Sequence, residues 1–449
     1  MFSRRAFVTG TLAIAVTGRA AAQGSADDWA GARAILARIR PPRFPAAVFP
    51  ITDQGARPGE PAHLAVQAAV DACATAGGGR VTVPAGLWLL NGAIHLRSNV
   101  ELHLDDDATL RFGKPGEIDL PLVLTRWEGT EVWNYSPLIY ARDCENVAIT
   151  GKGTIDGQGK DGFFKWRAKQ KADKEALRAM GATGVPVDQR RFGPGHYLRP
   201  AFVQFFDCRN VLIDGPRFED SPFWTIHPVY SSNVTVRNVT VVSKHLNSDG
   251  VDPDSCEDVL IEKSRFHVSD DCIAIKSGRD QDGRRVGRPT RNVVIRDCDL
   301  STDIAGAIAI GSEMSGGASN IFAERLRVRN AKQAIYIKAN LDRGGTVEQV
   351  RIRDMQVAKS VTLIDFTTAY HRCSGDADSP PTYRGFVVER VDCADTGQAL
   401  HIVGVWDAPI EDVVIRDVNV ALASTPNSIA HARGLLLDQV RVNAQYLTA

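Results

Sequence analysis

One short pattern recurs along most of the chain: an asparagine or aspartate, then a valine or isoleucine, then further β-branched residues in alternation. Clear copies begin at positions 99, 146, 210, 233, 258, 292, 320 and 412. Repetition at this period is typical of proteins in which each unit packs only on its neighbours. Because strand chemistry is constant while spacing varies, the sequence predicts an all-β fold, a single-stranded right-handed parallel β-helix with turns of unequal length.

The composition of the repeats supports parallel strands. Runs rich in valine and isoleucine suit strands that stack on their own kind in the coil interior. A β-sandwich is the alternative fold, and it would need hairpin turns such as Asn-Gly between its strands. Those dipeptides are scarce in this chain. The β-helix is therefore preferred.

Two segments do not follow the repeat. Residues 61–75 predict a helix that caps the first coil, with one apolar face formed by Leu64, Val66, Ala69, Val70 and Cys73. Residues 164–184 carry alternating charges and helix formers, and they predict an exposed helical insertion at the rim of a cleft. Since no linker divides the chain, we expect one domain over residues 42–449.

The N-terminus predicts a cleaved export signal. Residues 1–22 hold a twin arginine, Arg4 and Arg5, then a short apolar run and small residues before Gln23. A buried N-terminal helix is the alternative. No later apolar run approaches membrane-spanning length. We therefore expect a periplasmic or secreted protein that has no membrane contact after signal removal.

Charge excludes some classes of partner. The chain has 53 basic and 53 acidic residues, and removing residues 1–22 takes away three arginines and no acids. The remaining 50 basic residues against 53 acidic residues give a mildly acidic protein. Neither nucleic acid nor an anionic membrane surface is expected as a partner. The sequence does not determine the oligomeric state.

The eight cysteines predict no thiol metal site, because no two of them have the two-residue gap of zinc or redox motifs. Cys144, Cys208 and Cys256 each come two residues before an Asn/Asp-Val step. We expect these three to stack on one another as free, buried thiols.

Three aspartates indicate chemistry. Asp249 and the adjacent pair Asp270 and Asp271 are about one repeat apart. Neighbouring coils would bring them to roughly 4.8 Å from one another. Like charges this close raise one pKa and leave the others anionic, which supplies the acid and the base of glycoside hydrolysis. From spacing alone, ordinary turn aspartates remain an equal alternative.

Several motifs resemble glycoside hydrolase family 28, the polygalacturonase family, in its bacterial branch. They are residues 77–86 (GGGRVTVPAG), 98–104 (SNVELHL), 221–228 (SPFWTIHP), 247–256 (NSDGVDPDSC), 269–276 (SDDCIAIK) and 310–317 (IGSEMSGG). The resemblance implies a pectin lyase-like β-helix that hydrolyses pectic polysaccharide or oligosaccharide. It implies neither a cofactor nor a metal.

The resemblance also implies catalytic roles. Asp270 would protonate the leaving oxygen, while Asp249 and Asp271 would position and deprotonate the attacking water. The family inverts anomeric configuration, and inversion goes with carboxyl groups roughly 6.5–9.5 Å apart. Stacking at about 4.8 Å would favour retention on geometry alone. The expectation of inversion therefore rests on the resemblance.

Two departures from the family pattern concern the sugar carboxylate. Ala305 stands where the family has histidine, and Tyr336 stands where it has arginine. The hydroxyl and aromatic face of Tyr336 suit stacking on a sugar ring better than charge pairing. Lys338 keeps one positive charge, and Arg343 is a candidate replacement for the missing arginine. We expect an altered substrate site.

Other candidate residues have structural alternatives. His227 is predicted to line the cleft or to be a satisfied polar residue in a turn. Lys276 is predicted to face substrate or to be a solvated surface lysine. The aromatic stretch 127–135 could stack sugars or form a packing cluster.

Other functions remain open from the sequence. One is hydrolysis of rhamnogalacturonan or modified galacturonan. Another is a calcium-dependent pectate lyase with ligands among Asp249, Asp252, Asp254, Asp270 and Asp271. The third is a glycan-binding β-helix without catalysis.

Overall fold

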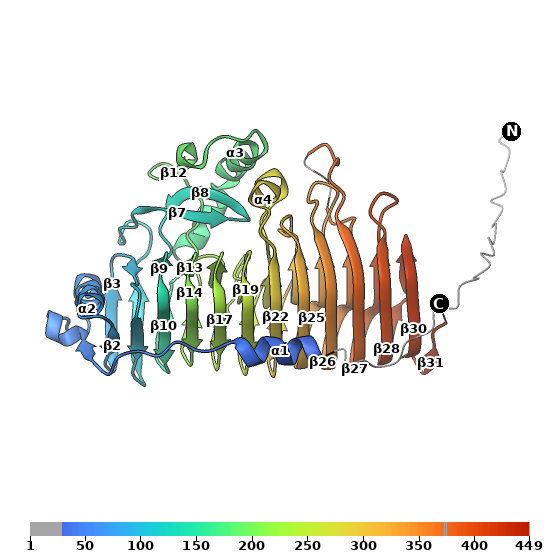
Figure 1. Ribbon diagram of the computed structural model, residues 1–449, viewed down its shortest axis with the longest axis horizontal. Coiled ribbons are helices and arrows are strands. Elements are labelled where there is room, and N and C mark those ends of the chain that lie inside the picture. The colour runs from blue at the N-terminus through green and yellow to red at the C-terminus, as the bar shows by residue number, and fades with distance from the viewer. Residues whose placement is uncertain (1–28, 372, 374, 449) are drawn as a thin grey trace.

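The computed structural model describes residues 29–371, 373 and 375–448 and forms one long stack of parallel coils (Figure 1). Neighbouring coils align side chain on side chain: Val147 pairs with Val211, and Val211 pairs with Val234. The predicted right-handed parallel β-helix is confirmed. The predicted export signal, residues 1–22, lies outside the described residues. No helix among the described residues is both long and apolar enough to cross a membrane.

Three strand columns run along the stack. The first contains β1 (Val48–Pro50), β2 (Gly79–Val83), β5 (Val100–Leu104), β10 (Glu145–Gly151), β14 (Arg209–Asp214), β17 (Ser232–Arg237), β19 (Glu257–Glu262) and β22 (Thr290–Arg296). The second contains β3 (Gly86–Leu90), β6 (Ala108–Phe112), β11 (Thr154–Asp156), β15 (Arg217–Glu219), β18 (Thr240–Ser243), β20 (Arg265–Val268) and β23 (Asp299–Thr302). The third contains β4 (Ile94–His95), β9 (Ile139–Arg142), β13 (Val203–Phe206), β16 (Ile226–Val229), β21 (Ile273–Ile275) and β24 (Gly306–Gly311).

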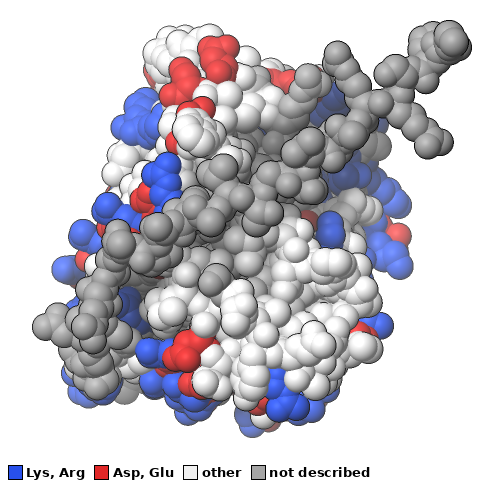
Figure 2. Space-filling view, turned by 90° about the vertical axis from the view of Figure 1, so that its right-hand side faces the viewer, with Lys and Arg blue, Asp and Glu red and all other residues white. Residues whose placement is uncertain are grey.

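Long bent strands form the last coils: β25 (Ala318–Lys338), β26 (Thr346–Thr367), β27 (Thr382–Val403), β28 (Ile410–Thr425) and β30 (Ala432–Val442), with the short β29 (Ser428–Ala430) and β31 (Gln445–Tyr446). Figure 2 looks at this end of the molecule, where much of the visible described surface is uncharged and Lys and Arg gather mainly toward the margin.

The residue that opens each repeat has a backbone role. All eight repeat-opening residues have φ between 51° and 61°, in the left-handed region that asparagine and aspartate tolerate better than other side chains. Several of their amides also bond from coil to coil: Asn146 donates to Asn99 at 2.9 Å, and Asn210 donates to Asn146 at 2.9 Å. The repeat therefore marks a corner of every coil, and the following β-branched residues fill the interior.

The predicted cap is confirmed as helix α2 (His63–Thr75), which lies at the N-terminal end of the stack (Figure 1). Val66, Ala69, Val70 and Cys73 are fully buried against the first coil. Leu64 was wrongly placed on this face, because its side chain is 73% exposed. It precedes Val66 by two residues, which puts it on the far side of a helix with 3.6 residues per turn.

A second helix, α1 (Ala30–Arg38), was not predicted. Its apolar residues Ala32 and Ile35 pack with Trp29 on the outside of the first column, against Val294 and Phe322. The domain was expected to begin near residue 42, whereas the described chain already packs on the β-helix from Trp29.

The predicted insertion is confirmed as the 3₁₀ helix η2 (Phe163–Ala168) and helix α3 (Lys171–Ala182). It sits above the middle coils beside the hairpin β7 (Leu122–Trp127) and β8 (Thr130–Tyr135), the short strand β12 (Arg191–Phe192) and helix α4 (Asp280–Val286) (Figure 1). Buried Arg190 donates to Asp282 at 2.7 Å, and Asp282 accepts the backbone N–H of Glu131 at 2.9 Å. This network joins the insertion, hairpin and α4 into one wall.

The cysteine stack is partly as expected. All eight cysteines are free, and all but Cys373 are buried. The N–H of Arg209 bonds to the carbonyl of Cys144, which places Cys144 and Cys208 on adjacent coils. Cys256 does not stack directly on Cys208, because Ser231 occupies the intervening coil and its hydroxyl accepts the N–H of Cys208. The prediction of three consecutive cysteines is wrong because a repeat can use serine at the same corner.

Candidate active site

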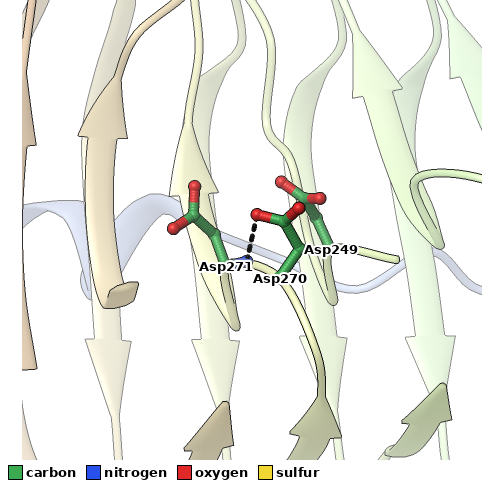
Figure 3. Close-up of side chains that lie close together, drawn as sticks. All are labelled: Asp249, Asp270 and Asp271. Atoms are coloured by element: carbon green, nitrogen blue, oxygen red, sulfur yellow. Dashed lines mark hydrogen bonds between the residues drawn. The ribbon is translucent and has the colours of Figure 1, made fainter. Parts of the chain in front are cut away.

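The three aspartates converge on the third strand column (Figure 3). Asp249 lies two residues before Val251, which bridges to Ile273, and Asp271 lies two residues before Ile273. Asp249 and Asp271 therefore occupy equivalent places on adjacent coils, with Asp270 beside them. One carboxylate oxygen from each lies within 4.8 Å of the others. The structure brings together the set that the repeat spacing predicted.

Asp270 is oriented by backbone donors. Its two oxygens accept the N–H of Asn247 at 2.9 Å and the N–H of Asp271 at 3.1 Å, the second drawn in Figure 3. Buried Arg199 fixes Asn247 by donating to its side-chain oxygen at 2.7 Å. Burial and the charge of Asp271 raise the pKa of Asp270, although Lys338 and the Asn247 N–H oppose the rise. A raised pKa favours the protonated form that a general acid needs.

Asp271 is held by a backbone hydrogen bond and an ion pair. It is 1% exposed, accepts the N–H of Gly306 at 2.7 Å and pairs with the Lys338 ammonium at 2.8 Å. That ammonium also lies 4.5 Å from the centre of the Tyr336 ring and 5.6 Å from that of Tyr370. Lys338 therefore balances Asp271 between two aromatic rings.

Asp249 has a second buried carboxyl near it, that of Asp252, and both lie close to the Lys276 ammonium. Burial and the nearby Asp252 and Asp270 raise the pKa of Asp249, while the Lys276 ammonium, 3.8 Å away, opposes the rise. Asp252 is fully buried, one of its oxygens lies 3.9 Å from the Lys276 ammonium, and neither oxygen has a hydrogen-bond partner among the described residues. Its pKa is also raised, first by burial. A proton on Asp252 removes one of the two buried charges and lets Asp249 ionise beside Lys276.

This arrangement predicts how Asp252→Asn changes the pH dependence of stability. The pKa of Asp252 is raised from its ordinary value of 3.8, so between that value and its folded pKa the folded state binds a proton that the unfolded state lacks. Its contribution therefore makes the unfolding free energy fall as pH rises, by up to about 1.4 kcal/mol per pH unit. Asparagine at position 252 does not titrate, so it makes no such contribution to the pH dependence of the unfolding free energy.

Urea unfolding of wild type and variant from pH 4.5 to 8 measures the effect. We expect the stability of Asp252→Asn relative to wild type to increase with pH. Asp106→Asn, at an exposed aspartate, is the control and should parallel wild type. Parallel curves for Asp252→Asn would contradict a proton on Asp252.

Lys276 belongs to a buried charge network rather than to the solvated surface. It is 3% exposed, and its ammonium lies 3.1 Å from Glu313 and 4.6 Å from the centre of the Trp224 ring. Arg279 binds the other oxygen of Glu313 at 3.0 Å. Burial would raise the pKa of Glu313, but Lys276 and Arg279 hold it well below its ordinary value.

These groups line one pocket of about 340 Å³. The lining comprises Glu128, Lys174, Arg178, Trp224, Asn247, Asp249, Asp270, Asp271, Lys276, Arg279, Ser312, Glu313, Lys338, Asn340, Arg343, Tyr370 and His371. The β-helix supplies the floor with the aspartates, while α3 and the hairpin turn supply a wall. Such a polar pocket with converging acids and cations suits an anionic sugar.

The remaining predicted residues differ in placement. Arg343 lines the pocket, but its guanidinium donates to the Ser312 carbonyl at 2.7 Å and pairs with Asp280. Tyr336 is partly exposed and adjoins the pocket through Lys338. Ala305 is buried directly before Gly306.

His227 is not part of the pocket lining. It is 1% exposed, lies against Trp224 and bonds Gln204 at 3.0 Å. Of the two roles predicted for His227, the structure therefore supports that of a buried polar residue with its hydrogen bonds satisfied. In the aromatic stretch, Trp127 stacks on Phe223 within a buried cluster, so Trp127 is a packing residue.

The sequence placed the insertion at the rim of a cleft, but sequence reasoning missed the residues of the wall that line the pocket. Lys174 and Arg178 were inside a predicted exposed insertion, and their spacing of one helical turn was the available signal for a shared face. The signal for Glu128 was weaker. It was the Glu128-Gly129 pair, a turn sequence between two stretches in which apolar and polar residues alternate. Both turn residues have positive φ, 41° and 80°, so the hairpin is tight and directs Glu128 into the pocket.

The donor set does not fit a calcium site. Calcium takes roughly six to eight oxygen ligands at about 2.3–2.6 Å. Here the ammonium groups of Lys276 and Lys338 stand 3.8 Å from Asp249 and 2.8 Å from Asp271 and already balance the carboxylates. The arrangement fits proton transfer.

Comparisons with known proteins agree with this chemistry. The model of Glycosyl hydrolases family 28 matches residues 73–434. A probable polygalacturonase of Vitis vinifera is 30% identical over 79% of this chain and 69% of its own length. The crystal structure of a hyperthermoactive exopolygalacturonase from Thermotoga maritima is 37% identical, with a TM-score of 0.88 over 93% of this chain and 96% of that one. A polygalacturonase from Erwinia carotovora ssp. carotovora, 23% identical with a TM-score of 0.65 over 88% of this chain and 98% of that one, shares the fold. The chain is therefore a glycosidase that belongs to glycosyl hydrolases family 28.

Proposed function

We propose that the protein hydrolyses glycosidic bonds next to galacturonate residues in pectic polysaccharides or oligosaccharides. The convergence of Asp249, Asp270 and Asp271 within 4.8 Å, in a pocket rich in cations, carries the proposal. Three carboxyls supply acid and base, and the surrounding lysines and arginines suit a substrate that bears carboxylates. The polygalacturonases to which the chain is similar support this substrate class.

In this mechanism Asp270 is the general acid. The raised pKa of Asp270 keeps its proton available for the leaving glycosidic oxygen. Asp249 and Asp271, side by side on adjacent coils, hold the attacking water between them and take up its proton. The ammonium of Lys338 pairs with Asp271, and that of Lys276 opposes the rise that burial causes in the pKa of Asp249.

The stereochemical proposal is inversion. Inverting enzymes usually separate acid and base by roughly 6.5–9.5 Å, and retaining enzymes by about 5–5.5 Å. The nearest oxygens here are closer than either range, so this distance does not decide between them. Inversion is proposed from the family resemblance, and two bases on neighbouring coils provide a place for the water that inversion requires.

We also propose attack at chain ends. The pocket of about 340 Å³ lies at the small end of the roughly 300–1,000 Å³ typical of ligand pockets. Its wall comes from α3 and the β7–β8 hairpin, which rise from the β-helix over the middle coils (Figure 1). A walled pocket accepts an end of a polymer, whereas cleavage of chain interiors needs an open groove.

Product analysis tests the function. We expect polygalacturonate to release galacturonate monomer from the first time points with little loss of viscosity, and proton NMR to show the inverted anomer first. Mass spectrometry of the same digests separates hydrolysis from elimination. Rhamnogalacturonan and a chelator-treated sample are controls, with no release expected from the first and no change from the second. Early long oligomers, an unsaturated product or release only from rhamnogalacturonan would contradict the proposal.

The export predicted from residues 1–22 is part of the proposed function, since the polymer substrate lies outside the cell. We propose a periplasmic or secreted location, reached through the twin-arginine signal.

A further inference from the structure

We propose that Arg178 and Lys174, on the inserted helix α3, bind the carboxylate of the sugar at the end of the substrate chain. The inference rests on the proposed function and adds a recognition site to it. This site belongs to the insertion, whereas the three aspartates belong to the β-helix.

Three cations meet at a single carboxylate on this wall. Glu128, at the hairpin turn, accepts from Lys174 at 2.7 Å and from Arg178 at 3.1 Å, and Arg279 lies 3.6 Å away. Arg279 also binds Glu313 at 3.0 Å, but Glu313 is shared with Lys276. Among the pocket residues that the structure describes, Glu128 is thus the one carboxylate paired with Lys174 and Arg178.

The charges of the pocket leave one cation unbalanced. Six cationic side chains and five carboxyls line it. Catalysis requires one of the aspartates to carry a proton, which leaves four anions, and Asp280 balances Arg343 from outside the lining. Asp252, 3.9 Å from Lys276 and also outside the lining, is counted as neutral because of the proton assigned to it above. Five negative charges then face six positive ones. The excess matches one carboxylate, and each galacturonate unit has one.

Of the cations that surround Glu128, Arg178 is suited to bind a second carboxylate. Its Nε is buried without a hydrogen-bond partner among the described residues, while its side chain as a whole is 29% exposed to the pocket. Burial and the charge of Arg279 lower the pKa of Arg178, while Glu128 and Glu313 oppose the change. Among the described residues this guanidinium makes one hydrogen bond, from Nη2 to Glu128 at 3.1 Å, so its terminal nitrogens keep donors for a second carboxylate. Glu128 keeps the side chain in place when the pocket is empty.

One cavity contains both the site for the sugar carboxylate and the aspartates that act on the glycosidic bond of the same sugar. Arg178 and Asp270 line the same 340 Å³ pocket, so a sugar bound through its carboxylate on α3 presents its glycosidic bond to the aspartates. A chain that continued past the terminal unit would meet α3. Recognition of the carboxylate and selection of the chain end therefore come from the same helix.

The test compares Arg178→Gln with wild type on digalacturonate and on its two monomethyl esters, one at each unit. In wild type, esterifying the unit bound at α3 should lower kcat/KM. Arg178→Gln should lose roughly 10- to 150-fold on digalacturonate, the worth of one hydrogen bond to a charged group, mainly through KM. It should also remove the penalty of esterification at that unit and keep the penalty at the other. Arg178→Lys should restore part of the preference.

Lys171→Gln is the matched control, because Lys171 is on the same helix, is exposed and does not line the pocket. It should behave as wild type. An equal loss on digalacturonate and both esters in Arg178→Gln would overturn the inference and indicate a structural role.

Binding of galacturonate and galactose by calorimetry separates this inference from the proposed function. Preference of wild type for galacturonate that is lost in Arg178→Gln supports the site even if no galacturonide is cleaved. Equal binding of the two sugars by wild type would overturn the site even if polygalacturonate is hydrolysed.

Discussion

Replacing Asp270 with asparagine is expected to lower kcat on polygalacturonate by about 10²- to 10⁴-fold, the usual contribution of a general acid. Asparagine has nearly the same shape, but its single oxygen can accept only one of the N–H groups that Asn247 and Asp271 donate to the two oxygens of Asp270. Because the change costs one hydrogen bond, the fold and substrate binding should persist with a modest loss of stability. What asparagine lacks is the proton that the buried site keeps on Asp270. The measurement is kcat and KM from reducing-sugar release.

An activated substrate makes this test specific to the acid role. An aryl galacturonide has a leaving group that needs little protonation, so the loss in Asp270→Asn should shrink on it. Asp249→Asn and Asp271→Asn should remain impaired on both substrates, because they act on water. Asp106→Asn is the control for an exposed aspartate. Equal losses on both substrates for Asp270→Asn would show that Asp270 is not the acid.

The pH profile of kcat/KM provides a second measure of the same group. The acid must be protonated, so activity falls as pH rises through the pKa of Asp270, which burial and Asp271 raise above 3.8. Lys338 opposes that rise, so the alkaline limb in Lys338→Met should move to higher pH while the rate falls. An unchanged limb would contradict the coupling between Lys338 and Asp270.

The β-helix could be predicted because its local chemistry repeats. Asparagine or aspartate at the opening of each repeat meets a left-handed backbone requirement, and such a requirement leaves a trace in sequence. The same regularity placed Asp249 and Asp271 on adjacent coils. Helix α2 was predictable from its 3.6-residue pattern, apart from Leu64.

The insertion at the cleft rim was predicted, but the residues by which it lines the pocket could not be, because their positions depend on long-range contacts. Glu128 and Arg178 are 50 residues apart, and their contact requires the hairpin and α3 to fold over the same coils. Nothing in the local pattern around either residue fixes that distance. Charged residues are common on solvated insertions, so in the sequence Lys174 and Arg178 could not be told from the other charged residues of an exposed helix face.

The pair of Arg126 and Asp254 holds this wall to the β-helix. Arg126, on β7, is 2% exposed and donates to Asp254 at 2.8 Å, to Ser255 at 2.8 Å and to the Gly129 carbonyl at 3.2 Å. Asp254 is fully buried on the third column. The guanidinium therefore links the hairpin turn that carries Glu128 to the coil that carries Asp249.

Arg126→Met is expected to lower the free energy of unfolding by about 3–5 kcal/mol, because it leaves Asp254 buried without its partner. Urea unfolding measures this loss. The double variant Arg126→Met/Asp254→Asn should recover much of it, since no uncompensated charge remains. Arg97→Met, which breaks an exposed pair with Asp71 at 3.1 Å, is the control and should cost less than about 1 kcal/mol.

The same variant also tests how the wall selects chain ends. In Arg126→Met the turn that positions Glu128 loses its anchor, so the wall should open and oligomers longer than the monomer should appear among the early products of polygalacturonate. The double variant lacks the anchor as well, so it should recover stability while keeping the longer products. The single and double variants would then differ in stability but give the same longer products. This result is expected only if Arg126 acts on the pocket through the position of the hairpin. Monomer alone from a folded Arg126→Met would show that the hairpin does not limit access to the aspartates.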